Sequence, residues 1–217
     1  MAVRPLAVKA SIHKPTLSVD DRALVAALAP QPGERILDFG SDAGQRLRLI
    51  AGYGGQCTGI DSSLSRLRTA RRWSSGALVV QSDLVQALPL ASRFFDAILF
   101  VVAGEHLEHL PEIALELHRV LRAQGRLVVA LNYPALEPLS LNSRRNRRKD
   151  FDELDHTLRS GPFRYRAKDY WSALAQAGFT DLRHHEVNSR SGRRYFDNPE
   201  KLKDFPPRVI LHATRHD

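Results

Sequence analysis

Residues 34–44 read ERILDFGSDAG, a short apolar run that contains Asp38 and passes at once into a turn with Gly40 and Gly44. We predict a strand over the apolar run and a helix over residues 43–51, directly after the turn. Glycines in such a turn let the backbone come close to a ligand, and the helix start presents free N–H groups. This stretch therefore predicts the first strand–turn–helix unit of a nucleotide-binding α/β fold.

Short apolar runs alternate with helical patterns along most of the remaining chain. We predict further strands at residues 57–60, 77–80, 95–102, 126–131, 180–187 and 208–213, and helices at residues 19–28, 62–72, 111–121 and 167–177. This alternation is typical of a doubly wound, parallel sheet with helices on both faces. The run at residues 95–102 is apolar throughout, as expected of a central strand that is buried on both sides.

The length and composition are those of one globular domain. The chain has 217 residues, 43% apolar and 26% charged, and we predict a single domain over residues 1–217. Residues 132–166 contain three prolines and no clear period, and we predict that they form an insert on the substrate side of the fold. The longest stretch without Asp, Glu, Lys or Arg is the 12 residues 49–60, whereas a membrane-spanning helix needs about 20 apolar residues.

The charge is less ordinary. There are 32 basic and 24 acidic residues, which give a net charge of +8 and a pI near 10.0 and suggest a nucleic-acid partner. Residues 144–217 hold most of the surplus, with 17 basic and 11 acidic residues. The densest basic cluster, at residues 144–149, is followed directly by four acids within residues 150–155, which repel phosphates. RNA is therefore an alternative partner rather than the first choice.

The single cysteine, Cys57, excludes an internal disulfide and a zinc site built from several cysteines. It lies in an apolar run, where we expect a buried structural thiol. A chain with one cysteine fits a reducing compartment, and we expect a cytoplasmic protein.

Two acids follow later strands. Asp61 lies 23 residues after Asp38, at the end of the second predicted strand, where a carboxylate can accept both hydroxyls of a ribose. Asp83 follows the third predicted strand. A glycine turn, a ribose acid and a third-strand acid in this order predict a nucleotide-type cofactor site.

Four segments carry a family resemblance: ERILDFGSDAG (34–44), GIDSS (59–63), QSDLVQALPLASRFFDAILF (81–100) and GEHLEHLPEIALELHRVLRAQGRLVVALNYP (104–134). They resemble the class I S-adenosylmethionine-dependent methyltransferases, especially the small type 11 branch that includes quinone-biosynthesis enzymes. The resemblance implies an α/β, Rossmann-like sheet of about seven strands with an antiparallel last strand, and S-adenosylmethionine as cofactor. A hydride-transfer dehydrogenase would use the same turn, but the RVLRAQGRLVV run and the third-strand acid favour the methyl donor.

The resemblance also implies which residues bind the cofactor: Asp38, Gly40, Ser41, Gly44, Asp61, Ser62, Asp83 and Leu84. The turn residues Gly40, Ser41 and Gly44 would pass under the methionyl part. Asp61 would hold the ribose. Asp83, with the backbone of Leu84, would face the adenine.

One residue departs from the family pattern. The family usually has a glycine at the position of Asp42, where the backbone and the cofactor come close. The Asp42 side chain adds a Cβ and a negative charge beside a ligand that carries a carboxylate and an ammonium group. Other residues also replace this glycine in the family, and a carboxylate that faces the ammonium would be neutral or favourable, so we expect cofactor binding to be retained.

Methyl transfer from a sulfonium needs little acid–base help, because the donor is already activated and positioning supplies most of the acceleration. If a catalytic residue exists, it is His106, which aligns with a Glu–His pair of the family after the fourth strand and would act as a general base. The alternative is a histidine at the solvent rim. His106 and His109 are spaced as metal ligands, but no third ligand is evident and we expect no metal site.

The acceptor is expected to be selected by the insert together with the N-terminal residues 1–17, with Tyr133, Arg144 and Arg145 on the substrate side. The first hypothesis is a methyltransferase for a small-molecule acceptor. The alternatives are a methyltransferase for RNA or a ribosomal protein, prompted by the charge, and a non-catalytic binding protein, prompted by Asp42. The oligomeric state and the pathway stay open.

Overall fold

A computed structural model describes residues 19–74, 76–102, 109–132, 167–187 and 208–217. Its strands are β1 (Arg35–Phe39), β2 (Gln56–Asp61), β3 (Leu78–Gln81), β4 (Phe95–Val101), β5 (Leu121–Asn132), β6 (Thr180–Val187) and β7 (Arg208–Thr214). Its helices are α1 (Val19–Leu28), α2 (Gln45–Gly52), α3 (Leu64–Trp73), α4 (Leu110–Val120) and α6 (Ala167–Gln176). Each of these elements overlaps one that the sequence predicts.

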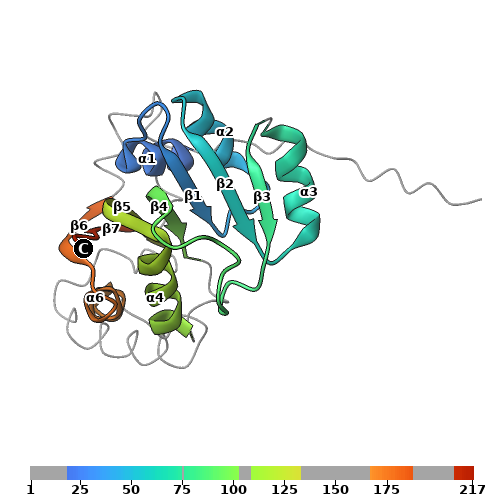
Figure 1. The fold of residues 1–217 in the computed structure, drawn as a ribbon. Helices are drawn as coiled ribbons and strands as arrows, with labels where there is room; N and C mark the ends of the chain where they lie inside the picture. Colours follow the sequence, from blue (N-terminus) through green and yellow to red (C-terminus); the bar gives the residue numbers. More distant parts are fainter. Residues whose placement is uncertain (1–18, 75, 103–108, 133–166, 188–207) are drawn as a thin grey trace, which may run out of the picture.

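The strands form one sheet in the order β3-β2-β1-β4-β5-β7-β6 (Figure 1). The pairs from β3 through β5 are all parallel, whereas β7 runs antiparallel to both of its neighbours, β5 and β6. The predicted fold, a mostly parallel, Rossmann-like sheet with an antiparallel last strand, is confirmed.

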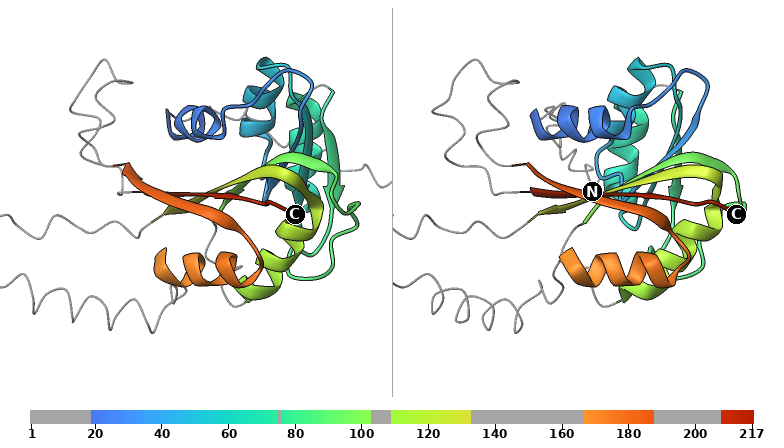
Figure 2. Two further views of the ribbon diagram at one scale, coloured as in Figure 1. Left: turned by 60° about the vertical axis from the view of Figure 1, so that its left-hand side comes forward. Right: turned by 90° about the vertical axis from the view of Figure 1, so that its left-hand side faces the viewer.

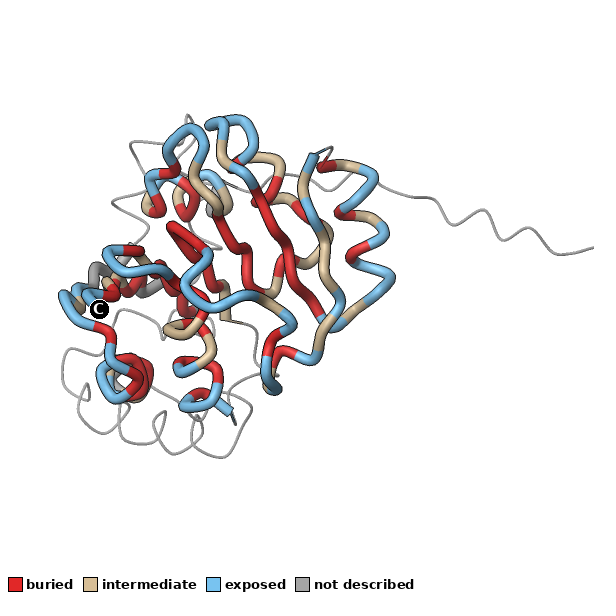
Figure 3. Tube along the Cα trace, viewed as in Figure 1, coloured by how far each residue is buried: buried red, intermediate tan, exposed pale blue. Residues whose placement is uncertain are grey.

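Helices cover both faces of the sheet. Figure 2 shows α1 and α2 on one side and α4 and α6 on the other. Alternate residues of each central strand enter opposite cores: Ile36 packs with residues of α1 and α2, and the next residue, Leu37, packs with residues of α4 and α6. The central strands are therefore buried along most of their length, as Figure 3 shows, which explains the continuous apolar run of β4.

The junction of α4 and β5 differs from the prediction. The sequence predicts a helix over residues 111–121, a stop at Gly125 and a strand from residue 126, but α4 ends at Val120 and β5 starts at Leu121, whose extended backbone (φ −76°, ψ 137°) ends the helix. Leu121 pairs with Phe95, and Arg126 pairs with Ala97, so the residues between them form an excursion from the strand. The apolar pattern missed this start because the excursion interrupts the period.

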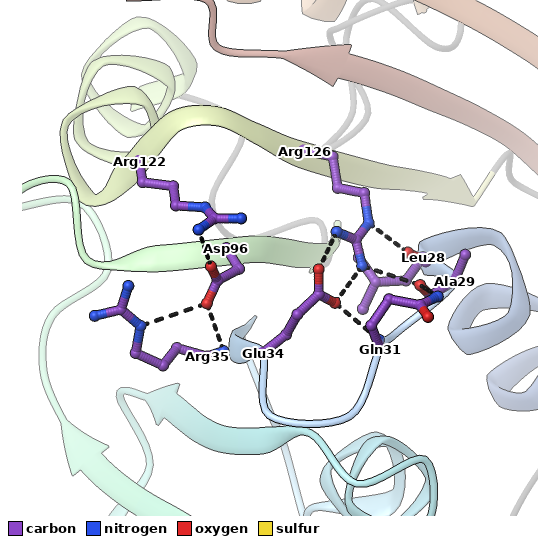
Figure 4. A network of polar contacts seen from close by, with 8 residues as sticks. All are labelled: Leu28, Ala29, Gln31, Glu34, Arg35, Asp96, Arg122 and Arg126. Atoms are coloured by element: carbon purple, nitrogen blue, oxygen red, sulfur yellow. Dashed lines mark hydrogen bonds and ion pairs between the residues drawn. The ribbon is translucent and has the colours of Figure 1, made fainter.

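A network of charged side chains lies at the amino ends of β1 and β4 (Figure 4). Arg126 donates to both carboxylate oxygens of Glu34, at 2.7 and 2.6 Å, and to the last carbonyls of α1, at Leu28 and Ala29. This contact joins β5 to the end of α1. Asp96 accepts from the Arg35 backbone N–H at 2.7 Å and pairs with Arg122 at 2.8 Å. Several arginines of the chain therefore have acidic partners within the fold.

None of the helices in the described ranges is long and apolar enough to cross a bilayer. The predicted insert at residues 132–166 lies outside the described residues except for its first residue, at the end of β5. The single-domain assignment and the role of the insert stay predictions.

Candidate cofactor site

The residues predicted to bind the cofactor lie at or after the carboxyl ends of the parallel strands β1, β2 and β3. From β1 the chain continues to β2 and β3 on one side and then returns to β4 and β5 on the other. Open α/β sheets bind ligands outside the carboxyl ends of the strands at such a reversal. Gly40 follows β1 here, and Asp61 ends β2, one strand away from the reversal. The charged network of Figure 4 lies at the other end of these strands, at their amino ends.

The turn after β1 is fixed to β2. The backbone N–H groups of Gly40 and Ser41 both donate to the carbonyl of Ile60, at 2.9 and 3.0 Å. Gly40 has a φ of +73°, which a residue with a side chain rarely adopts. The turn closes where the N–H of Gly44 donates to the carbonyl of Ser41 at 3.0 Å. The path of the backbone past the site is therefore set by β1 and β2 together.

Gly44 is required for helix packing. A Cβ at Gly44 would lie 2.8 Å from the Cβ of Ala70 on α3, and φ is +83°. The Gly44 carbonyl also accepts the hydroxyl of Ser74 at 3.0 Å. The glycine therefore lets α3 approach the start of α2, while its expected place under the methionyl group stays a prediction.

Asp61 connects two turns. Its Oδ2 accepts the N–H of Asp42 at 3.0 Å, and its Oδ1 accepts the N–H of Ser63 at 2.9 Å. The residue is 4% exposed. Each carboxylate oxygen can accept a further hydrogen bond, so Asp61 keeps acceptor capacity for the hydroxyls of a ribose.

Asp42 has a local partner for its charge. The residue has a φ of +50°, in the left-handed region where Asp is tolerated better than most residues. Its Oδ1 lies 3.3 Å from Nε of Arg66 on α3, and both side chains are about half exposed. The negative charge that departs from the family pattern is therefore balanced within the site.

Asp38 is fully buried beneath the turn. Its Oδ1 accepts Nε of Arg46 at 3.0 Å, and burial raises its pKa against the opposing effect of the Arg46 charge. Arg46 also donates from Nη2 to the Gly40 carbonyl at 2.8 Å. Arg46 could not be predicted as a site residue from the sequence, because no spacing rule connects a helix residue to an acid eight positions earlier.

Asp83 and Leu84 follow β3. The Asp83 carboxylate is exposed and accepts the Val85 N–H at 3.1 Å and the Gln86 side-chain amide at 2.9 Å. The Leu84 side chain is buried in the core, so Leu84 has its backbone to offer to a ligand. Ser62 is exposed, and its carbonyl accepts the side-chain amide of Gln81 at 3.2 Å.

The residues expected to act on the acceptor, His106, Tyr133, Arg144 and Arg145, lie outside the described residues. His109 is described and occupies the N-cap position of α4 without a side-chain hydrogen bond to the helix. The structure therefore brings together the cofactor half of the predicted site.

The polar groups at this edge fit a ligand that brings hydrogen-bond donors. Asp61 and the exposed Asp83 are carboxylates, which only accept when ionised, and a ribose and an adenine offer hydroxyl and amino donors. The residues present therefore fit the nucleoside part of S-adenosylmethionine.

Comparison with known proteins supports the same family. A family model described as a methyltransferase domain matches residues 37–129. A malonyl-[acyl-carrier protein] O-methyltransferase of Enterobacter lignolyticus is 33% identical over 137 residues, which are 63% of this chain and 53% of the relative. A demethylmenaquinone methyltransferase of Tropheryma whipplei is 34% identical over 109 residues, which are 50% of this chain and 46% of the relative. The chain thus spans about half the length of these relatives.

Solved structures share the fold. A phosphoethanolamine N-methyltransferase of Haemonchus contortus in complex with S-adenosyl-L-methionine superposes with a TM-score of 0.65 at 16% identity, covering 91% of this chain and 52% of that one. The matched residues 37–129 include the glycine turn, Asp61 and Asp83. Over residues 37–129 in sequence, and over most of its length in fold, the chain is therefore similar to S-adenosylmethionine-dependent methyltransferases.

Proposed function

We propose that this protein transfers the methyl group of S-adenosylmethionine to a small-molecule acceptor. The observation that carries the proposal is Asp61, a nearly buried carboxylate that ends β2 and hydrogen-bonds the backbone of the turn after β1. This is where a class I methyltransferase needs its ribose acid. A cytoplasmic location stays a prediction from the sequence.

The chain's own residues hold and orient the cofactor in this proposal. Gly40, Ser41 and Gly44 would bind the methionyl part, while Asp61 and Ser62 would bind the ribose hydroxyls. The exposed Asp83 and the Leu84 backbone would contact the adenine. The cofactor supplies an activated sulfonium methyl group, so the protein contributes mainly position and exclusion of water.

Three features would act on the acceptor. His106 would take a proton from an acceptor hydroxyl or acidic carbon, since a neutral imidazole is a suitable base near neutral pH. Tyr133 would line the acceptor pocket, and Arg144 and Arg145 would bind an anionic group. The acceptors in the relatives' names, a malonyl group on acyl-carrier protein and demethylmenaquinone, make a carboxylate or a quinol the first acceptor classes to assay.

The cofactor is tested first. Calorimetric titration with S-adenosylmethionine and S-adenosylhomocysteine should show binding in the micromolar range, and no binding at millimolar cofactor would contradict the proposal. The variant Asp61→Ala should lose binding. The matched control is Asp181→Ala. It removes an exposed carboxylate that pairs with His216 and lies on β6, the outermost strand at the end of the sheet away from β2 and β3. The control should bind like the parent protein.

The acceptor is tested next. Transfer of a radioactive methyl group should label a small-molecule fraction, and His106→Ala should reduce the rate by about 10²-fold or more if His106 is the base. Label in RNA, with a steep salt dependence, would overturn the small-molecule assignment. Cofactor binding without transfer to any fraction would favour a binding protein.

A further inference from the structure

Arg46 lies at the junction of three elements. Its Nε donates to Asp38 Oδ1 at 3.0 Å on β1, and its Nη2 donates to the Gly40 carbonyl at 2.8 Å in the turn. Its Nη1 lies 3.6 Å from Asp21 Oδ1 on α1. One guanidinium therefore contacts the strand before the turn, the turn itself and the first helix.

These contacts are made away from water. Asp38 is fully buried, and the side chains of Arg46 and Asp21 are 9% and 14% exposed. A charge that is buried with its partners is strongly coupled to them, because removing one partner leaves the other without water or counter-charge. The planar guanidinium donates in several fixed directions at once, whereas a lysine ammonium is a point charge that cannot span the same three partners.

Both backbone polar groups of Gly40 are hydrogen-bonded. Its N–H donates to the Ile60 carbonyl on β2, and its carbonyl accepts Nη2 of Arg46. Gly40 has a φ of +73°. Glycine has the widest conformational freedom of all residue types, so the backbone at this position could otherwise adopt other conformations. The contact with Arg46 therefore removes the freedom that would otherwise let the turn leave the cofactor-binding geometry.

We propose that Arg46 is a positioning residue for the cofactor: held by Asp38, it fixes the Gly40 carbonyl directly, and it couples the turn to α1 through Asp21. This inference rests on the proposed function, because the turn is the expected contact of the methionyl part. Cofactor binding and the docking of α1 then stabilise each other, since such coupling is reciprocal.

The variant Arg46→Lys tests the position of the guanidinium while keeping its charge. It should fold with a lowered midpoint of thermal unfolding, because a charge-assisted hydrogen bond in a buried network is lost. At a temperature well below that midpoint, its Kd for S-adenosylhomocysteine should rise at least about tenfold, because the same hydrogen bond no longer holds the turn. The matched control is Arg48→Lys on the same helix, whose side chain forms no ion pair in the described part of the chain. The control should bind like the parent.

Hydrogen exchange tests the second part of the proposal, the coupling of the turn to α1 through Asp21. In the parent protein, S-adenosylhomocysteine should slow amide exchange in residues 19–28, and Asp21→Asn should abolish this protection while the affinity falls only a few-fold. If Arg46→Lys does not fold, Arg46→Leu combined with Asp38→Asn removes both buried charges together. That double variant should recover stability but keep the weak affinity.

The outcomes separate the two proposals. If the parent protein does not bind S-adenosylhomocysteine, the proposed function is wrong and the inference is wrong with it. If the parent binds and Arg46→Lys or the double variant binds equally well, Arg46 is only a structural counter-charge and the inference alone is overturned. If the KM for S-adenosylmethionine rises while kcat stays within about twofold, positioning of the cofactor is supported.

Discussion

The Oδ2 atom of Asp61 accepts the backbone N–H of Asp42 at 3.0 Å. The acid that the resemblance assigns to the ribose is thus also a structural link between the turns that follow β1 and β2. Its Oδ1 accepts the N–H of Ser63, the N-cap residue of α3. Because both oxygens face N–H donors, the site requires a carboxylate here even before any ligand binds.

Asp61→Asn should therefore lower stability as well as affinity. An amide places an NH2 group against one of the two N–H donors, so at least one hydrogen bond is lost and a buried donor is left without an acceptor, at a cost of about 1–3 kcal/mol. The free energy of unfolding, measured with urea, reports this loss. Asp181→Asn makes the same change at an exposed carboxylate on β6 and should leave both the free energy of unfolding and the affinity for the cofactor unchanged. Full stability of Asp61→Asn with loss of cofactor binding would show that Asp61 serves only the ligand.

Asp42→Gly should stabilise the protein. Asp42 has a φ of +50°, where a side chain costs on the order of 1 kcal/mol and glycine does not. The half-exposed pair with Arg66 contributes less than that, so its loss does not cancel the gain. We expect a higher unfolding midpoint and retained cofactor binding. Arg66→Ala serves as the control, because it removes the ion pair and leaves the backbone of Asp42 unchanged. If Arg66→Ala raised the stability as much as Asp42→Gly, backbone strain would not be the cause.

Most of the helices and strands could be predicted from the sequence, because the patterns that indicate them involve residues that are close together in the chain. The glycine turn, the strand that contains Asp38 and the acid at the end of β2 are each defined by fewer than a dozen neighbouring residues, and the structure places all three as predicted. The antiparallel direction of the last strand followed from the resemblance rather than from any pattern in the residues.

Contacts between distant elements could not be predicted. Arg126 and Glu34 are 92 positions apart, and their contact depends on how β5 aligns with the end of α1. The position of Arg46 over Asp38 depends on the rotation of α2 about its axis, which amphipathic spacing does not define for a short helix. In both cases the sequence shows a charge but not its partner.

Stability should fall on acidification through Glu34. The Arg126 guanidinium donates to Glu34 and holds the pKa of that carboxyl below its ordinary value of 4.5. A lowered folded-state pKa contributes stability above 4.5 that is lost as the pH falls through the folded-state pKa. Glu34→Gln should therefore cost about 1–2 kcal/mol at pH 7, and the difference from the parent should shrink as the pH falls from 4.5 toward 3. Urea unfolding at several pH values measures it, with Glu112→Gln on the exposed start of α4 as the control.

Cys57 should be chemically silent in the folded protein. The thiol lies on β2 in the core beneath α2, where its Sγ is 3.5 Å from the Leu47 carbonyl, and burial raises its pKa to about 12. Since the thiolate is the reactive form, alkylation and disulfide exchange at pH 8 require both deprotonation and exposure, and the fold disfavours both. Ellman's reagent should release no colour from the native protein within minutes and one equivalent in urea. Rapid reaction of the native protein would mean that β2 and α2 separate readily, and the same opening would then expose the cofactor turn between them.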